Sequence, residues 1–160
     1  MPEHPSKSAE ELPDVLVTNA DFDIAILHSE LAAQGSDVGA VATFVGLVRD
    51  INQGDTVFAM ELESYPGMTE RSIQAIIDEA RGRWVLSAVR VVHRIGKLLP
   101  GDQIVYVGVA SLHRGEAFAA CEFIMDYLKT RAPFWKKESI AGQERWVESR
   151  QTDEEAAKRW

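Results

Sequence analysis

A Pro-Gly-Asp turn at 100–102 lies between two β-rich runs, 89–95 and 104–110, and this arrangement limits the folds open to the chain. Pro, Gly and Asp favour turns because each stabilises a backbone conformation that strands do not use. A connection this short joins antiparallel neighbours, since parallel strands need a longer crossover. The chain should therefore contain an antiparallel pair, and a helical pattern over 114–129 follows it directly.

The remaining segments alternate between strand and helix patterns. Strands are predicted at 15–18, 39–48, 58–63, 134–139 and 145–149, and a helix at 24–33, capped by Asn19 or Asp21. After a break at Pro66-Gly67, a second helix is indicated by one apolar face formed by Ile73, Ile76, Ile77, Ala80 and Trp84. Because hairpins and helices are mixed along the chain, the predicted class is α+β, with a mostly antiparallel sheet and flanking helices. We divide the chain into an N-terminal extension (1–13), a single domain (14–150) and a charged C-terminal tail (151–160) that could form a short helix.

The composition is that of an acidic globular protein, with 46% hydrophobic residues, 26% charged residues and a net charge of -8. The acidic balance argues against nucleic-acid binding, which needs many cationic phosphate contacts. No apolar run reaches membrane-spanning length, and the first 13 residues lack the pattern of a signal peptide. These features favour a cytoplasmic protein that binds neither nucleic acid nor membrane.

Several common catalytic motifs are absent from the sequence. There is no P-loop and no G-x-G-x-x-G, and His93 and His113 are too isolated to indicate a metal site. The one cysteine, Cys121, cannot form an intramolecular disulfide and falls on a helical apolar stripe, which favours a packing role. We therefore predict no metal and no cofactor.

A cationic segment stands out against the acidic background. Lys129, Arg131, Lys136 and Lys137 crowd together around Pro133, with Phe134 and Trp135 between them. Met125 and Lys129 share a helix face because they are four residues apart, and the break at Pro133 can fold Lys136 back toward Lys129. Such a cluster suits an anionic, partly planar ligand. The alternative is a set of solvated surface cations, with Lys129 complementing the helix dipole.

Two further positions could contribute to an anion site. Ser111-Leu-His-Arg114 lies where a strand leads into a helix, and the free N–H groups at a helix start bind phosphate. Alternatively, Ser111 caps the helix, and His113 and Arg114 are ordinary surface residues. Arg49 directly follows a buried strand. The residues by themselves thus indicate an α+β domain with a cationic pocket for a phosphorylated ligand, either an enzyme or a module that only binds an anionic metabolite.

From about residue 38 to the end, the chain resembles the large, catalytic subunit of molybdopterin synthase, the MoaE family. The resemblance rests on an ordered set of motifs: Thr43-Phe-Val-Gly-Leu-Val-Arg49, Glu63-Ser-Tyr-Pro-Gly-Met68, His93-Arg-Ile-Gly96, Pro100-Gly-Asp102, Ser111-Leu-His-Arg114 and the whole of 126–138. It implies an α+β fold of the α/β-hammerhead type.

The resemblance also implies an activity and partners. The enzyme would be a sulfurtransferase that converts precursor Z, a cyclic pyranopterin monophosphate, to molybdopterin in two sulfur transfers. The sulfur would come from a thiocarboxylate on the C-terminal Gly-Gly of a small ubiquitin-like carrier subunit. Two catalytic subunits would form a homodimer at the centre of a heterotetramer.

The family's functional positions fall on residues of the motifs above. Lys129 and Lys136 correspond to the catalytic lysines. The substrate-binding positions correspond to Arg49, His113, Arg114, Phe44, Met125 and Arg150, and His113 and Arg114 would reach the site from a neighbouring subunit. No metal or sulfur ligand is required of the chain, so Cys121 needs no role as a sulfur carrier.

Overall fold

The computed structural model of the chain describes residues 13–52, 54–147 and 151–160. The elements are β1 (Val15–Thr18), α1 (Ile24–Ala32), β2 (Ala40–Leu47), β3 (Ile51–Asn52), β4 (Asp55–Thr56), β5 (Ala59–Ser64), α2 (Met68–Arg83), β6 (Ala88–Arg94), β7 (Gly96–Leu98), β8 (Gln103–Ser111), α3 (Arg114–Arg131), β9 (Phe134–Ile140), β10 (Gln143–Val147) and α4 (Gln151–Ala157). No helix in these ranges is long and apolar enough to cross a membrane.

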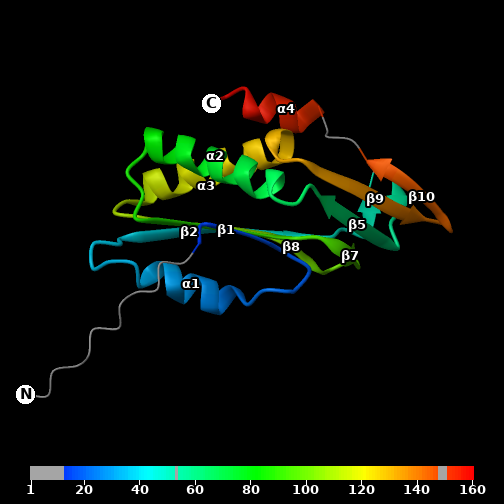
Figure 1. Cartoon of the computed structure of the whole chain (residues 1–160), viewed down its shortest axis with the longest axis horizontal. Coiled ribbons are helices and arrows are strands. Elements are labelled where there is room, and N and C mark those ends of the chain that lie inside the picture. The colour runs from blue at the N-terminus through cyan, green and yellow to red at the C-terminus, as the bar shows by residue number, and fades with distance from the viewer. Residues whose placement is uncertain (1–12, 53, 148–150) are drawn as a thin grey trace, which may run out of the picture.

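The central sheet has the strand order β1-β6-β8-β2. β6 pairs antiparallel with β8, as the sequence predicts, and β8 pairs antiparallel with β2. β1 is the exception, because it runs parallel to β6. Figure 1 shows α2 and α3 on one face of this sheet and α1 on the other. The α+β class with a mostly antiparallel sheet and flanking helices is therefore confirmed.

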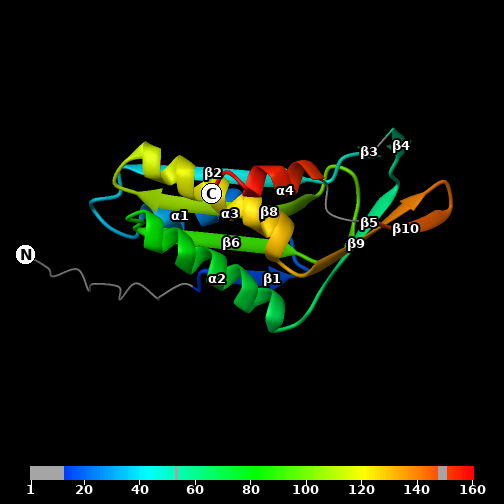
Figure 2. The ribbon, with the colours of Figure 1, turned by 90° about the horizontal axis from the view of Figure 1, so that it is seen from above.

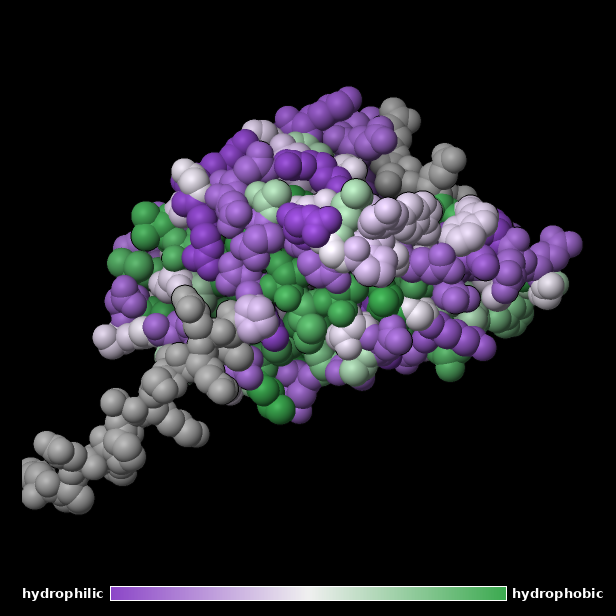
Figure 3. All heavy atoms as spheres, viewed as in Figure 1, coloured by the Kyte–Doolittle hydropathy of each residue, from purple (hydrophilic) through white to green (hydrophobic). Residues whose placement is uncertain are grey.

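The main core lies between the central sheet and the pair α2 and α3. The stripe predicted on α2 is fully buried at Ile73, Ile76, Ile77 and Ala80, and the stripe on α3, which includes Cys121, is buried as well. Figure 3 shows mainly hydrophilic side chains over the helical layer on the side that carries α2. Each helix is thus amphipathic, and burial of its apolar face fixes it on the sheet.

The second sheet, here called the distal sheet, has the order β10-β9-β5-β7 and projects from one end of the molecule (Figure 2). The connection between β6 and β8 is not the simple hairpin that the sequence predicts. It includes β7, which leaves the central sheet and pairs with β5. Gly96, the first residue of β7, and Gly101, which follows the strand, have φ of 87° and 89°, a left-handed conformation that favours glycine. The turn at 100–102 therefore joins β7 to β8.

The break after α3 directs the chain from one sheet to the other. Pro133 cannot continue the helix, and Ala132 is already extended at φ -80° and ψ 128°. The Thr69 hydroxyl, at the start of α2, donates a hydrogen bond to the Pro133 carbonyl over 2.9 Å. β9 then begins at Phe134 and pairs with β5. This local geometry places the cationic segment where the two sheets meet.

The C-terminal tail packs on the outside of α3. Trp160 makes edge contacts with Trp84 and Phe123, and its Nε1 donates a hydrogen bond to Asp126 over 2.6 Å. The charged tail therefore contains α4 and a partly buried aromatic residue, Trp160, that packs against the core. Residues 1–12 of the N-terminal extension lie outside the described residues, and the division into extension, domain and tail stays a prediction.

Two local predictions were wrong. Asp23, and not Asn19 or Asp21, caps α1, because its carboxylate accepts hydrogen bonds from the first free N–H groups of the helix. Phe58 lies before β5 and is 59% exposed, so it is not part of the buried face of that strand. α2 begins at Met68, directly after the predicted break at Pro66-Gly67, and the Glu70 side chain accepts a hydrogen bond from the Gly67 N–H.

Candidate active site

Lys129 and Lys136 lie on either side of the break that follows α3. Lys129 is in the last turn of the helix and is exposed, and Lys136 is the third residue of β9 and is partly buried. The helix C-terminus carries a partial negative charge that favours a cation in its last turn. The structure therefore places both predicted catalytic lysines at the junction of the two sheets.

The alternation of β9 separates the cationic segment into two faces. Phe134, Lys136 and Glu138 share the face that Leu62 and Met60 of β5 occupy, since these residues are cross-strand partners. Both β5 side chains are buried, so this is the inner face of the distal sheet. Trp135 and Lys137 face the other way. Lys137 contacts Trp146 and Glu144 on that side, so only part of the segment can serve one site.

Glu138 is a polar residue of this site that the sequence reasoning missed. Its carboxylate is almost completely buried, with 1% exposed, and lies 3.5 Å from the Lys136 ammonium. Asn52 donates a hydrogen bond to the same oxygen, and Arg145 lies 3.7 Å from the other one. A buried carboxylate needs such partners. Glu138 thus holds the Lys136 side chain through an ion pair on the inner face of the distal sheet. The sequence contained a signal for this pair, because residues 136 and 138 of a strand at 134–139 lie on one face.

His93, which is too isolated in the sequence to indicate a metal site, lies at the same junction. It is the sixth residue of β6, and its ring stacks on Phe134 with centroids 3.8 Å apart. Burial lowers the pKa of His93 to about 4; the hydrogen bond to the Arg94 carbonyl opposes the lowering, and the positive charge of Lys129 adds to it. The imidazole is therefore neutral at physiological pH.

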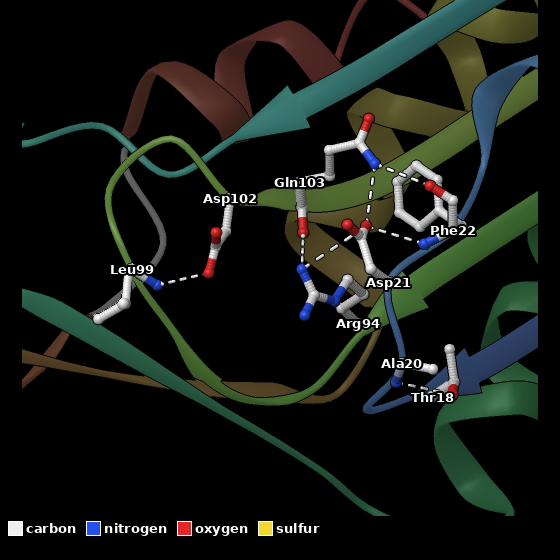
Figure 4. A network of polar contacts seen from close by, with 8 residues as sticks. All are labelled: Thr18, Ala20, Asp21, Phe22, Arg94, Leu99, Asp102 and Gln103. Carbon is white, nitrogen blue, oxygen red and sulfur yellow. Dashed lines mark hydrogen bonds and ion pairs between the residues drawn. The ribbon is translucent and has the colours of Figure 1, made fainter.

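A polar network on the opposite face holds this end of the central sheet (Figure 4). Arg94 donates to the Gln103 carbonyl over 3.0 Å and lies 3.7 Å from Asp21, and the Gln103 amide donates to Asp21 over 2.9 Å. The bond from Gln103 lowers the pKa of Asp21, and the one from the Phe22 N–H acts in the same direction. The network ties the segment before α1 to β6 and β8, which keeps the backbone beside His93 in place.

Three predicted substrate-binding residues lie toward the same end. Met125 packs against the edge of the core one turn before Lys129, and Phe44 of β2 is 41% exposed. Arg49 is exposed just beyond β2 and lines an open hollow of about 580 Å³ together with Pro100 and Gly101. Arg49 and Met125 thus lie toward the same end of the folded molecule as the two lysines.

His113 and Arg114 lie at the other end of α3. His113 is the N-cap residue and Arg114 the first residue of the helix, and both are exposed. Fifteen residues separate Arg114 from Lys129, which at 1.5 Å per residue is about 22 Å along the helix axis. Ser111 is not the cap, because its hydroxyl bonds to the Val85 carbonyl instead. One chain does not bring these residues to the lysines, and Arg150 lies outside the described residues.

Two further features of the described ranges are Cys121 and the metal-ligating residue types. Cys121 is buried, and burial raises the pKa of its thiol to about 11, so it carries no reactive thiolate near neutral pH. No group of three or more His, Cys, Asp or Glu side chains in the described part of the chain could hold a metal ion. What the junction offers is a set of cations beside aromatic and apolar side chains, which can bind an anionic, planar molecule.

Comparison with known proteins shows the family of the chain. The family model "MoaE protein" matches residues 17–131. The molybdopterin synthase catalytic subunit of Vibrio cholerae is 61% identical over 146 residues, which cover 91% of this chain and 97% of that protein. The solved molybdopterin biosynthesis MoaE protein from Burkholderia ambifaria has a TM-score of 0.81 and 51% identity, covering 93% of this chain and 98% of that one.

A more distant structure shares the fold. It is a complex of subunits 1 and 2 of molybdopterin-converting factor from Helicobacter pylori, with a TM-score of 0.71 and 19% identity, covering 86% of this chain and 92% of that one. The family model spans more than half of the chain, and the Vibrio cholerae relative matches it nearly from end to end. The chain therefore belongs to the MoaE protein family.

Proposed function

We propose that this chain is the catalytic subunit of a molybdopterin synthase, which converts precursor Z to molybdopterin with sulfur from a small carrier subunit. The observation that carries the proposal is the placement of Lys129 and Lys136 on either side of the α3 break, in a chain 61% identical to a molybdopterin synthase catalytic subunit. Cytoplasmic action is part of the proposal and suits a chain whose single cysteine is an unpaired thiol.

The proposed chemistry uses the lysines as fixed positive charges. The carrier's C-terminal thiocarboxylate is an anion, and its sulfur forms a bond to a carbon of precursor Z. Water then attacks the carbonyl of the resulting thioester, an oxyanion forms and collapses, the bond between the carbonyl carbon and sulfur breaks, and the carrier leaves as a carboxylate. Lysine ammonium groups held at that point stabilise the developing charge. Glu138 and the β9 backbone hold Lys136 in place, so its charge need not be reorganised during the reaction. Cys121 takes no part, since a buried, protonated thiol cannot carry sulfur.

The carrier is proposed to insert its tail toward Lys129. Support comes from the solved two-subunit complex of the Helicobacter pylori factor, which shares this fold. An extended tail is captured through main-chain hydrogen bonds and by cationic donors around its terminal group. The exposed end of α3 leaves Lys129 accessible to such a tail.

A homodimer would complete the site. β2 is an edge strand of the central sheet and carries the exposed side chains of Phe44 and Leu47, and α3 packs beside it with Phe118 65% exposed. Two β2 edges that pair antiparallel about a two-fold axis would set the two α3 helices antiparallel. The N-terminus of one α3, with His113 and Arg114, would then lie beside Lys129 of the partner subunit.

Mixed dimers test this arrangement. Arg114→Ala should weaken precursor Z binding by roughly 1.5–3 kcal/mol, the value of a lost charged hydrogen bond, and Lys129→Ala should be inactive. When the two variants are mixed and their subunits exchange, about half of the dimers contain one chain of each variant. In such a dimer, one site combines the intact Lys129 of one chain with the intact Arg114 of the other, and the second site carries both substitutions. We expect kcat/KM for precursor Z to recover to about a quarter of the wild-type value. No recovery would mean that each site is built from one chain.

The function itself can be tested by complementation. A bacterium that lacks its own molybdopterin synthase catalytic subunit should regain molybdoenzyme activity when it expresses this chain. A module that only binds an anionic metabolite would not restore that activity, although it would still bind precursor Z in vitro.

A further inference from the structure

Arg49 begins a loop that is anchored on both sides. The preceding residue, Val48, is buried, and its backbone makes two hydrogen bonds with the turn at 100–102, over 2.9 and 2.8 Å. After Arg49, the Asp50 carbonyl accepts the Val57 N–H over 2.7 Å and closes the base of the hairpin formed by β3 and β4. This hairpin lies at the same end of the molecule as β10 (Figure 2). The place of Arg49 therefore depends on where the hairpin is held.

Arg145 of β10 contacts the hairpin through both terminal nitrogens of its guanidinium group. Its Nη1 donates to the Asp55 carboxylate of β4 over 2.9 Å, and its Nη2 donates to the Asn52 carbonyl of β3 over 3.4 Å. Nη2 also lies 3.7 Å from the Glu138 carboxylate, which accepts a hydrogen bond from the Asn52 side chain. Asn52 and Asp55 are cross-strand partners in the hairpin. These contacts therefore hold the hairpin against the distal sheet.

An arginine suits this position because its guanidinium group is a planar fork with several donors, whereas the lysine ammonium is a point charge. The ion pair with Asp55 contributes little by itself, since half of the Asp55 side chain is exposed to water. The contact with Glu138 is different, because a buried carboxylate is only weakly screened by salt. Glu138 also pairs with Lys136 through its other oxygen. Arg145 thus connects the hairpin that follows Arg49 to the carboxylate that holds Lys136.

We propose that Arg145 is a positioning residue for Arg49: it clamps the β3–β4 hairpin to the distal sheet and so fixes where the Arg49 guanidinium meets the anionic substrate. Arg145 acts through the hairpin and does not contact the substrate itself. Its partners Asn52 and Asp55 come three and six residues after Arg49, so a hairpin that moves takes the Arg49 loop with it. The effect on precursor Z rests on the proposed function, whereas the clamp does not.

A double-mutant cycle separates positioning from direct binding. Arg145→Met keeps an apolar stem and removes all three contacts, and it should weaken precursor Z binding, measured by titration calorimetry without carrier, by on the order of tenfold. Arg145→Lys keeps a cation and should recover part of this loss. In an Arg49→Ala background, Arg145→Met should cost little more, because residues that act through one another are not additive. Wild-type affinity in Arg145→Met, or additive losses in the double variant, would overturn the proposal.

Native-state amide hydrogen exchange tests the clamp without any substrate. In Arg145→Met, the N–H of the buried Val57 should exchange on the order of tenfold faster, because the hairpin opens more easily. The N–H of Ile76 in α2 should keep its wild-type rate. Lys137→Met is the matched control, because Lys137 is a cation on the outer face of the same sheet, and it should change neither rate.

The exchange rates also separate the clamp from the proposed function. An unchanged Val57 rate in Arg145→Met, or an equal increase at Val57 and Ile76, would overturn the clamp even in an active synthase. Failure of the wild-type chain to bind precursor Z would contradict the proposed function alone, and faster exchange confined to Val57 would still support the clamp.

Discussion

Lys129→Ala is expected to abolish sulfur transfer while the protein stays folded. Loss of one positioned donor from an enclosed site costs on the order of a hundredfold or more in rate, and Lys129 is the cation at the end of α3 that the carrier tail is proposed to meet. The side chain is exposed, so its removal takes little from the core, which is formed by neighbours such as Leu128. Single-turnover formation of molybdopterin measures the loss, and thermal unfolding checks the fold.

Lys137→Ala is the control for this prediction. Lys137 belongs to the same cationic segment but contacts Glu144 and Trp146 on the outer face of β9, so its removal should leave turnover close to that of the wild type. Lys136→Ala, on the inner face, should be severely impaired. Wild-type turnover in Lys129→Ala, or equal losses in Lys129→Ala and Lys137→Ala, would remove Lys129 from the catalytic role.

Deletion of the carrier's terminal Gly-Gly is expected to have an equally large effect. The sulfur-bearing group is lost with the tail, and no group of this chain can replace it, since the Cys121 thiol is buried and protonated. Product formation should therefore stop, and association, measured by titration calorimetry, should weaken without disappearing, because contacts outside the tail remain. Sulfur transfer by the truncated carrier would show that the tail does not deliver the sulfur.

The sequence predicted the parts of the fold that repeat regularly. The buried stripe of α2 and the pairing of β6 with β8 follow from periodicity and from the turn at 100–102. The transfer of β7 to the distal sheet does not, because three residues carry too little pattern to reveal their partner strand. The position of Phe58 was also missed, since alternation alone does not define where a strand begins.

For the candidate site, too, the sequence predicted some features and not others. The break at Pro133 correctly indicates that a helix ends and a strand begins between Lys129 and Lys136, and the shared catalytic role of the two lysines stays a prediction. The burial of Glu138 and the stack of His93 on Phe134 depend on contacts between segments far apart in the sequence, which local patterns do not encode. The separation of Arg114 from Lys129 could have been read from the length of the helix.

Reconstitution of the reaction tests the central claim most directly. The purified chain, precursor Z and thiocarboxylated carrier are mixed, and molybdopterin and spent carrier are quantified over time. The account predicts one molybdopterin for every two carriers converted to the carboxylate form, and no product from carrier that lacks the thiocarboxylate. Precursor Z that binds the chain but stays unchanged in the presence of loaded carrier would contradict it.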